Sequence, residues 1–237
     1  MNPNPGYPNL ALYLDEALLV VNKPAGLPTL VDGFHPDAPY LVGLMGQAHG
    51  RIWVVHRLDK DTSGVIVFAR TADAHRDLNA QFEQRRARKV YHALVLGQPN
   101  WDEHSVDLPL RPNGDRRHRT VIDLQMGKPA ITKLRVLEGF GAFTLVEAIP
   151  LTGRPHQIRA HLAACGHPLI ADQLYKRSGE AYPASNPGTE PIRRLGLHAC
   201  SLTLFHPING QVQHFEAPYP QDFSDALEQL RHSYKPN

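Results

Sequence analysis

Side chains able to do chemistry are concentrated in one short stretch of the sequence, from His56 to Gly64. The stretch reads His-Arg-Leu-Asp-Lys-Asp-Thr-Ser-Gly and lies between two apolar, β-branched runs, residues 52–55 and 65–69. Such runs predict two buried strands rather than helices. A polar loop held between two strands is a typical place for catalysis, because a core tolerates charges only where each is paired. The alternative is a charged turn that merely bends the chain.

Basic side chains form local clusters, although the formal net charge is only +2. The clusters are Arg85, Arg86, Arg88 and Lys89; Arg111, Arg116, Arg117, His118 and Arg119; and the pairs Lys176-Arg177 and Arg193-Arg194. Clusters of this kind suit contacts to phosphates. A solvated surface is the alternative for any one of them, and the first also complements the C-terminal dipole of a predicted helix. Taken together, the clusters favour RNA as a partner.

The sequence gives little support to metal-dependent or hydrolytic chemistry. His156 and His161 are five residues apart, about 140° on a helix, so they do not share one ligand face. The sequence has neither a G-x-S-x-G elbow nor a glycine-rich phosphate loop before a helix. Cys165 and Cys200 lack metal-ligand spacing, and we expect reduced core thiols rather than a disulfide. We therefore expect no metal and no cofactor.

The composition is that of a soluble globular protein. Of the 237 residues, 42% are hydrophobic and 20% are charged. No apolar run is long enough to cross a bilayer, and the first residues lack a basic region followed by an apolar one. We expect a cytoplasmic protein with no membrane partner.

The elements that must position these residues are short strands and a few helices. Strands are predicted over residues 10–14, 18–21, 52–55, 65–69, 90–96, 131–137, 142–149, 201–205 and 212–215, and helices over 38–47, 71–82, 153–166 and 221–230. Most neighbouring strands are joined by hairpin-like connections, which predicts an α+β fold with a largely antiparallel mixed sheet and flanking helices.

The remaining segments are predicted to be loops or tails. Residues 1–9 are expected to form a disordered tail and residues 10–237 a single catalytic domain. Residues 101–123 are expected to be polar and loop-rich, and residues 176–191 a mobile loop. Lys23 is expected to be a solvated loop lysine, with contact to RNA as the alternative.

Several motifs resemble those of one family, the RluA-type pseudouridine synthases. His56–Gly64 resembles its HRLD-x-x-TSG signature, and Thr152–His161 resembles TGR-x-HQIR-x-H. Shorter matches are Asn22–Gly26 with NKP-x-G, Lys89–Val95 with K-x-Y-x-A-x-V, Gly166–Tyr175 with G-x-P-I-x-G-D-x-x-Y, and Leu197–Ala199 with LHA. Two positions depart from the pattern. Leu151 stands where many members carry a basic residue, and Ala171 stands where glycine is usual.

The resemblance implies a catalytic site. Asp59 would be the catalytic carboxylate, Arg159 would pair with it, and Tyr91 would stack near the target base. Asp59 would either attack the anomeric carbon of the ribose or remove the adjacent ribose proton, and the sequence leaves both routes open. The expected substrate-binding residues are Arg57, Arg154, His156, Arg116, Arg117 and Arg119. Arg57 would contact phosphate or fill the space of a flipped base.

The resulting hypothesis is an RNA pseudouridine synthase that acts on ribosomal or transfer RNA stem-loops as a monomer, with no DNA partner. No additional RNA-binding module is expected before residue 10, so target choice would come from the catalytic domain and its loops. A catalytically inactive RNA-binding protein of the same fold is the main alternative, although it would be expected to lack Asp59 or Arg159. A glycosidic-bond hydrolase is a third possibility, which would release free uracil. The target RNA and uridine stay open.

Overall fold

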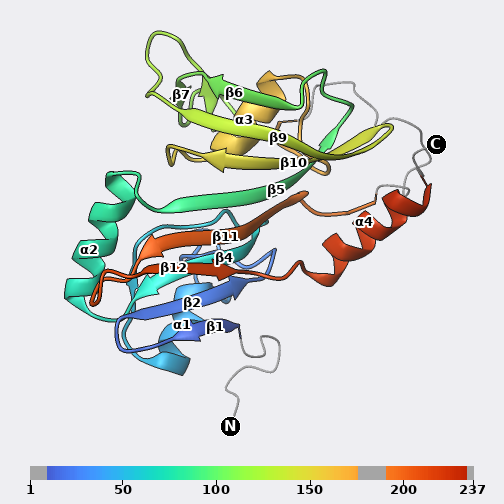
Figure 1. Ribbon diagram of the computed structural model, residues 1–237. Helices are drawn as coiled ribbons and strands as arrows, with labels where there is room; N and C mark the ends of the chain where they lie inside the picture. Colours follow the sequence, from blue (N-terminus) through green and yellow to red (C-terminus); the bar gives the residue numbers. More distant parts are fainter. Residues whose placement is uncertain (1–9, 176–190, 234–237) are drawn as a thin grey trace. The chain divides into compact units, whose positions relative to one another are not determined.

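The computed structural model describes residues 10–175 and 191–233 (Figure 1). The predicted tail over residues 1–9 and nearly all of the predicted loop over 176–191 lie outside the described residues. Backbone contacts divide the chain into two compact units, residues 1–89 with 199–218 and residues 90–198 with 219–237. Each unit combines antiparallel strands with helices, so the predicted α+β class is confirmed. A single catalytic domain over 10–237 stays a prediction.

The first unit is built on a sheet with the strand order β1-β2-β4-β11-β12. Its strands are β1 (Ala11–Leu14), β2 (Leu18–Lys23), β3 (Trp53–Val54), β4 (Ser63–Ala69), β11 (Leu197–Phe205) and β12 (Val212–Glu216), and its helices are α1 (Leu41–His49) and α2 (Ala72–Glu83). The β1–β2 and β11–β12 hairpins occur where the sequence predicts them. The side chains of β4 are buried throughout, which makes this strand the centre of the unit.

Local sequence signals account for both helices of the first unit. Thr71 caps α2, because its hydroxyl accepts a hydrogen bond of 3.1 Å from the amide of Ala74. Helix α1 begins at Leu41 rather than at the predicted Ala38. Ala38 directly precedes Pro39, and a residue before proline disfavours helical geometry. It ends at Gly50, whose φ of 79° is the left-handed geometry that glycine adopts without strain.

The run 52–55 forms less structure than predicted. Only Trp53 and Val54 pair with β4, and all four residues are half-buried rather than buried. The Arg51 guanidinium lies 4.6 Å from the centre of the Trp53 ring, so the exposed part of the indole is covered by a cation. The prediction of two buried strands around the polar loop is therefore right for β4, whereas residues 52–55 form only the short, half-buried strand β3.

The second unit contains a sheet with the strand order β5-β10-β9-β6 and a separate two-stranded sheet. Its elements are β5 (Arg88–Leu96), β6 (Glu103–Asp107), β7 (Leu110–Arg111), β8 (Val121–Ile122), β9 (Ile131–Phe140), β10 (Phe143–Pro150), α3 (Gln157–Ala164) and α4 (Gln221–Ser233). The predicted apolar face of α4 is confirmed, because Phe223, Ala226, Leu227 and Leu230 are its buried residues. They pack in one cluster with Leu94, Phe140 and Ile170.

Three segments of the second unit differ from prediction. Residues 101–123, predicted to be loop-rich, contain the short strands β6, β7 and β8. The strand β6 pairs with β9, but its sequence is too short to show a clear alternation of apolar and polar residues. The β9–β10 turn is only Gly141-Ala142, because β9 extends through residues 138–140 of the predicted loop. Helix α3 begins at Gln157, after Pro155, because His156 has a left-handed φ of 51° that no α-helix contains.

Candidate active site

Asp59 lies half-buried in the loop between β3 and β4 of the first unit. Its neighbour Leu58 is buried, whereas Arg57 and Lys60 are exposed. The carbonyl oxygen of Asp59 accepts a 3.1 Å hydrogen bond from the amide of Thr62, which closes a tight turn directly after the carboxylate. The predicted catalytic residue is therefore in an ordered loop and partly accessible.

Lys23 is not a solvated loop lysine, and that prediction is wrong. It is the last residue of β2 and is fully buried. Its ammonium group donates to the carbonyl oxygens of Pro24 at 2.9 Å, Leu27 at 2.7 Å and Lys60 at 2.9 Å. A buried ammonium is tolerated here because carbonyl acceptors satisfy it. One of those acceptors belongs to the residue that follows Asp59.

His56, the first residue of the polar loop, has a structural role. Its ring stacks on Phe82 at 4.6 Å between centres, and its Nε2 accepts a hydrogen bond from the amide of Val67 at 3.2 Å. Burial, and then the positive charge of Lys89, lowers the pKa of His56 to about 3. The imidazole is therefore neutral at physiological pH and holds the start of the loop against β4.

Arg159 lies on α3 and forms a buried ion pair with Asp172. Its Nε and Nη2 donate to the two carboxylate oxygens at 2.7 and 2.8 Å, and its guanidinium lies 5.1 Å from the centre of the Tyr175 ring. Asp172 also accepts from the amides of Leu174 and Tyr175. Sequence reasoning missed this pair, although both motifs containing it were recognised. The predicted pairing of Arg159 with Asp59, a residue of the first unit, stays a prediction.

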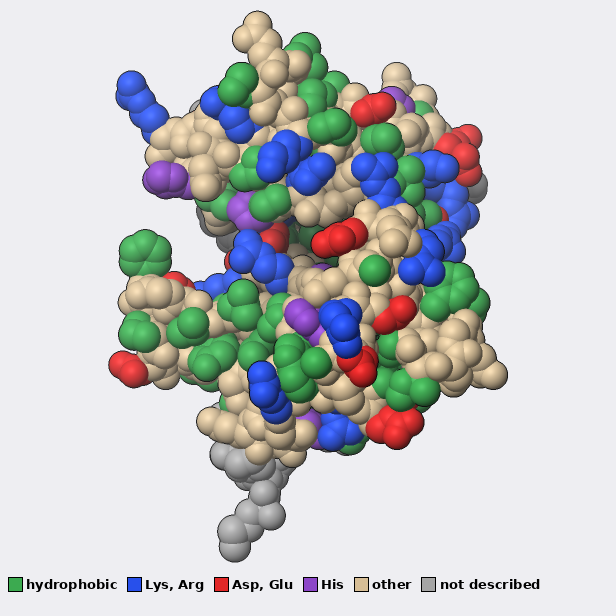
Figure 2. Space-filling model, turned by 90° about the vertical axis from the view of Figure 1, so that its left-hand side faces the viewer, with side chains coloured by type: hydrophobic (Ala, Val, Ile, Leu, Met, Phe, Trp, Pro, Cys, Tyr) green, Lys and Arg blue, Asp and Glu red, His purple; other side chains and the backbone are tan. Residues whose placement is uncertain are grey.

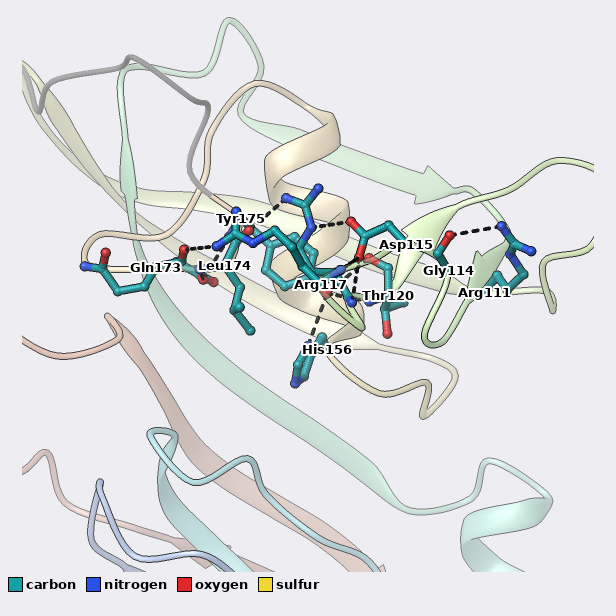
Figure 3. A network of polar contacts seen from close by, with 11 residues as sticks. Arg111, Gly114, Asp115, Arg117, Thr120, His156, Gln173, Leu174 and Tyr175 are labelled. Carbon is teal, nitrogen blue, oxygen red and sulfur yellow. Dashed lines mark hydrogen bonds and ion pairs between the residues drawn. The ribbon is translucent and has the colours of Figure 1, made fainter. Parts of the chain in front are cut away.

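The second basic cluster, apart from Arg111 at the end of β7, lies in the basic loop between β7 and β8, and charged contacts hold this loop in place (Figure 3). Arg119 binds Asp115 at 2.6 Å and the carbonyl oxygen of Leu174 at 2.8 Å. Arg117 donates to the carbonyl oxygen of Gln173 at 3.1 Å. Hydrogen bonds from Arg119, first from its amide and then from its side chain, lower the pKa of Asp115, so this ion pair is charged at neutral pH.

Tyr175 joins the basic loop to the N-terminus of α3. Its hydroxyl accepts a 3.0 Å hydrogen bond from the amide of Thr120 and lies 3.2 Å from Nδ1 of His156 (Figure 3). The structure thus brings Arg117, Arg119 and His156 together around the 173–175 segment.

The predicted substrate-binding residues Arg116 and Arg154 and the predicted catalytic residue Tyr91 differ in their contacts. Arg116 is exposed and makes no hydrogen bond or ion pair with another described residue. Arg154 donates through Nε to the carbonyl oxygen of Pro129 at 3.2 Å. Tyr91 is half-buried on β5 and packs against the core cluster that contains Ile158 and Leu162 of α3.

Within residues 10–175 and 191–233, no group of three or more His, Cys, Asp or Glu side chains is placed to hold a metal ion. His161 is a buried histidine whose two nitrogens contact the Thr132 hydroxyl and the Leu108 carbonyl oxygen. Both cysteines are free thiols, and both are half-buried rather than fully buried in the core. Cys165 packs against the core cluster that contains Ile158 and Leu162. None of the helices in the described part of the chain has the length and apolar character needed to cross a membrane.

The sequence profile of the family described as RNA pseudouridylate synthase matches residues 17–164, a span that includes the Asp59 loop, Tyr91 and Arg159. The chain belongs to this family. Its members are isomerases that act on RNA.

Individual synthases support the assignment along most of the chain. The ribosomal large subunit pseudouridine synthase D of Nitrosomonas europaea is 40% identical over 230 residues, which cover 93% of this chain and 64% of that protein. The chain thus spans slightly less than two thirds of that relative. The dual-specificity RNA pseudouridine synthase RluA of Salmonella typhi is 39% identical over 209 residues, which cover 87% of this chain and 91% of that protein.

A solved structure also resembles the chain. The human RNA pseudouridylate synthase domain-containing 4 protein aligns with a TM-score of 0.74 at 27% identity, over 93% of this chain and 92% of that one. The predicted family and fold are therefore confirmed, whereas the roles of the individual site residues stay predictions.

Proposed function

We propose that this protein converts uridine to pseudouridine in ribosomal RNA, transfer RNA or both, with Asp59 as the reacting carboxylate. The observation that carries the proposal is that the family match runs through an ordered loop in which Asp59 is partly accessible. The substrate class follows the names of the relatives, a ribosomal large subunit synthase and a dual-specificity synthase. We further propose that it acts in the cytoplasm, as a monomer, and without a metal or other cofactor.

The proposed reaction moves the base from a nitrogen link to a carbon link on the same ribose. The N1–C1′ bond breaks, the base turns, and a C5–C1′ bond forms, while the proton of C5 is lost and N1 gains one. No oxidant and no second group are needed. Asp59 either attacks C1′ or removes the neighbouring ribose proton. Both routes need its ionised form, which a nearby guanidinium favours, and we assign that role to Arg159.

The target nucleotide must leave its stack for the ribose to meet a carboxylate in a pocket. Tyr91 would stack near the flipped base, and exposed Arg57 would contact phosphate or fill the vacated space. These two roles rest on the motifs in which the residues occur.

Phosphate contacts would come from particular loops rather than from a general positive surface. On the face that Figure 2 shows, Lys and Arg side chains are interspersed with acidic and hydrophobic ones. Exposed Arg116 is available for such contacts, and exposed Arg117 has further guanidinium donors besides the one that binds Gln173. Arg119 orders the loop that carries them. His156, next to the 173–175 segment, and Arg154 would add further contacts to the RNA.

The decisive experiment compares Asp59→Asn with Asp61→Asn, which makes the same change at an exposed residue two positions along the loop. Asp59→Asn should lower pseudouridine formation by at least about 1,000-fold, because it removes the charge that both routes require. RNA affinity should stay within a few-fold, since phosphate contacts supply most of the binding. Asp61→Asn should retain activity.

The assay measures pseudouridine and free uracil on one stem-loop in the presence of EDTA. Equal activity of Asp59→Asn and the wild-type protein would overturn the assignment of Asp59. Free uracil in place of pseudouridine would indicate a hydrolase. RNA binding by wild-type protein without any product would indicate a catalytically inactive protein.

A further inference from the structure

The peptide groups on either side of Asp59 are fastened to one segment of the first unit, residues 23–29. On the N-terminal side, the hydroxyl of Thr29 donates to the carbonyl oxygen of Leu58 at 2.8 Å and accepts from the amide of Leu58 at 3.3 Å. Thr29 is only 4% exposed. One hydroxyl thus satisfies both backbone polar groups of the residue before Asp59.

On the C-terminal side, the carbonyl oxygen of Lys60 accepts two hydrogen bonds from the same segment. The ammonium of Lys23 and the amide of Gly26 each donate to it at 2.9 Å. Gly26 has a φ of 82°, a left-handed geometry that suits glycine. Lys23 also donates to the carbonyl oxygens of Pro24 and Leu27. Its ammonium group therefore stabilises the 23–29 segment and joins that segment to the Asp59 loop.

We infer that Thr29 and Lys23 are positioning residues for Asp59, and this inference rests on the proposed function. Neither side chain has to touch the RNA. They fix the backbone before and after the carboxylate, and a misplacement of about 1 Å can slow an enzyme by roughly 100-fold. Rigid support of this kind lets a half-exposed side chain on a loop keep one reactive geometry.

A purely structural role is the competing explanation, since buried hydrogen bonds also stabilise the fold. The two explanations differ in what the loss of the Thr29 hydroxyl changes. A structural role predicts lower stability with an unchanged rate per folded molecule. A positioning role predicts a lower kcat in protein that is still fully folded, with RNA binding unchanged.

Thr29→Val is the main test, because valine has nearly the shape of threonine but neither donates nor accepts a hydrogen bond. Thr29→Ser keeps the hydroxyl and should restore most of the rate. The matched control is Thr144→Val in the second unit. Thr144 is 1% exposed, and its hydroxyl donates to the carbonyl oxygen of Gly97 at 2.7 Å. Both valine substitutions therefore remove a buried threonine hydroxyl.

The measurements are kcat and KM for pseudouridine formation, RNA affinity, and unfolding by denaturant. We expect Thr29→Val to lower kcat by between about 10-fold and 100-fold, with KM and RNA affinity within about twofold. Thr144→Val should lose comparable stability and keep kcat. A kcat for Thr29→Val equal to that of Thr144→Val would overturn the inference.

Two further outcomes are distinguishable. If Thr29→Val does not fold, Thr29→Ala, which also lacks the donor and the acceptor, replaces it. A wild-type kcat for Thr29→Ala would then contradict the inference, and a reduced kcat rescued in Thr29→Ser would support it. If wild-type protein and Thr144→Val both fail to form pseudouridine, the proposed function is wrong and the positioning role falls with it.

Discussion

The loop around Asp59 and the basic loop between β7 and β8 are both ordered, but different interactions order them. The Asp59 loop is held through its backbone, by the Thr29 hydroxyl and the Lys23 ammonium. The basic loop is held through its own side chains, by Arg117 and Arg119. A loop that must place one carboxylate is fixed at its peptide groups. A loop that must meet phosphates uses some of its arginines to fix itself and leaves others exposed.

The two loops also differ in how much stability is lost when one of the contacts that hold them is removed. The donors that hold the Asp59 loop are buried, so removing one leaves carbonyl oxygens without a partner. The side chains of the Arg119–Asp115 pair are 29% and 25% exposed, and such pairs contribute about 0–1 kcal/mol. We therefore expect substitutions of the supporting residues to destabilise the Asp59 loop more than the basic loop. In the second unit, the Arg159–Asp172 pair is buried, so its loss should also be costly.

Asp172→Asn should have the largest effect on stability. It removes the buried negative charge that accepts two hydrogen bonds from the Arg159 guanidinium, which should lower the free energy of unfolding by about 3–5 kcal/mol. The control is Asp222→Asn, because Asp222 also pairs with an arginine, Arg194, but is 49% exposed. That change should cost at most about 1 kcal/mol. Equal losses in denaturant unfolding would show that burial of the pair does not matter.

The pH dependence of stability should reveal the neutral His56. Its pKa of about 3 in the folded protein lies below the ordinary value of 6.5, so the unfolded chain takes up the proton first. The stabilisation is complete above about pH 6.5 and is lost as the pH falls toward 3. Between pH 7 and 4.5, His56→Gln should lose roughly 2–3 kcal/mol less than wild-type protein. Parallel pH profiles for the two proteins would contradict this.

Replacing Arg116 and Arg117 together by alanine should weaken RNA binding for all sequences alike. If each arginine contacts one phosphate, the slope of log affinity against log salt should fall by about 1.4–1.8. The control is Arg76→Ala with Arg135→Ala, two exposed arginines outside the basic loop. An unchanged slope in the first variant would make the basic loop a solvated surface.

Ala171→Gly should have the smallest effect and should stabilise the protein. Ala171 has a left-handed φ of 57° directly before Asp172, at the position where the family pattern has glycine. Relief of this strain is expected to add roughly 0.5–1 kcal/mol, even though the glycine chain loses more entropy on folding. A thermal melt measures it. A lower melting temperature would mean that packing of the buried Ala171 methyl group outweighs the strain.

Local sequence determined much of the fold. The apolar face of α4, the Thr71 cap of α2 and the hairpin of β9 with β10 were all predictable, because helix and strand periods and caps act between residues close in the chain. The placement of Asp59 in a polar loop before β4 was predictable for the same reason.

Tertiary structure alone decided which polar residues hold the site. The sequence predicts a solvated loop lysine at position 23, whereas the fold buries Lys23 and brings the carbonyl oxygen of Lys60 to its ammonium group. The predicted contact of Arg119 with phosphate stays a prediction, and the fold adds a contact to Leu174 that the sequence does not reveal. Arg159 and Asp172 are 13 residues apart in the sequence, and their ion pair forms where Asp172 follows the left-handed Ala171. No sequence period or motif reveals such partners. A hydrogen bond depends on distance in space, whereas a sequence gives only distance along the chain.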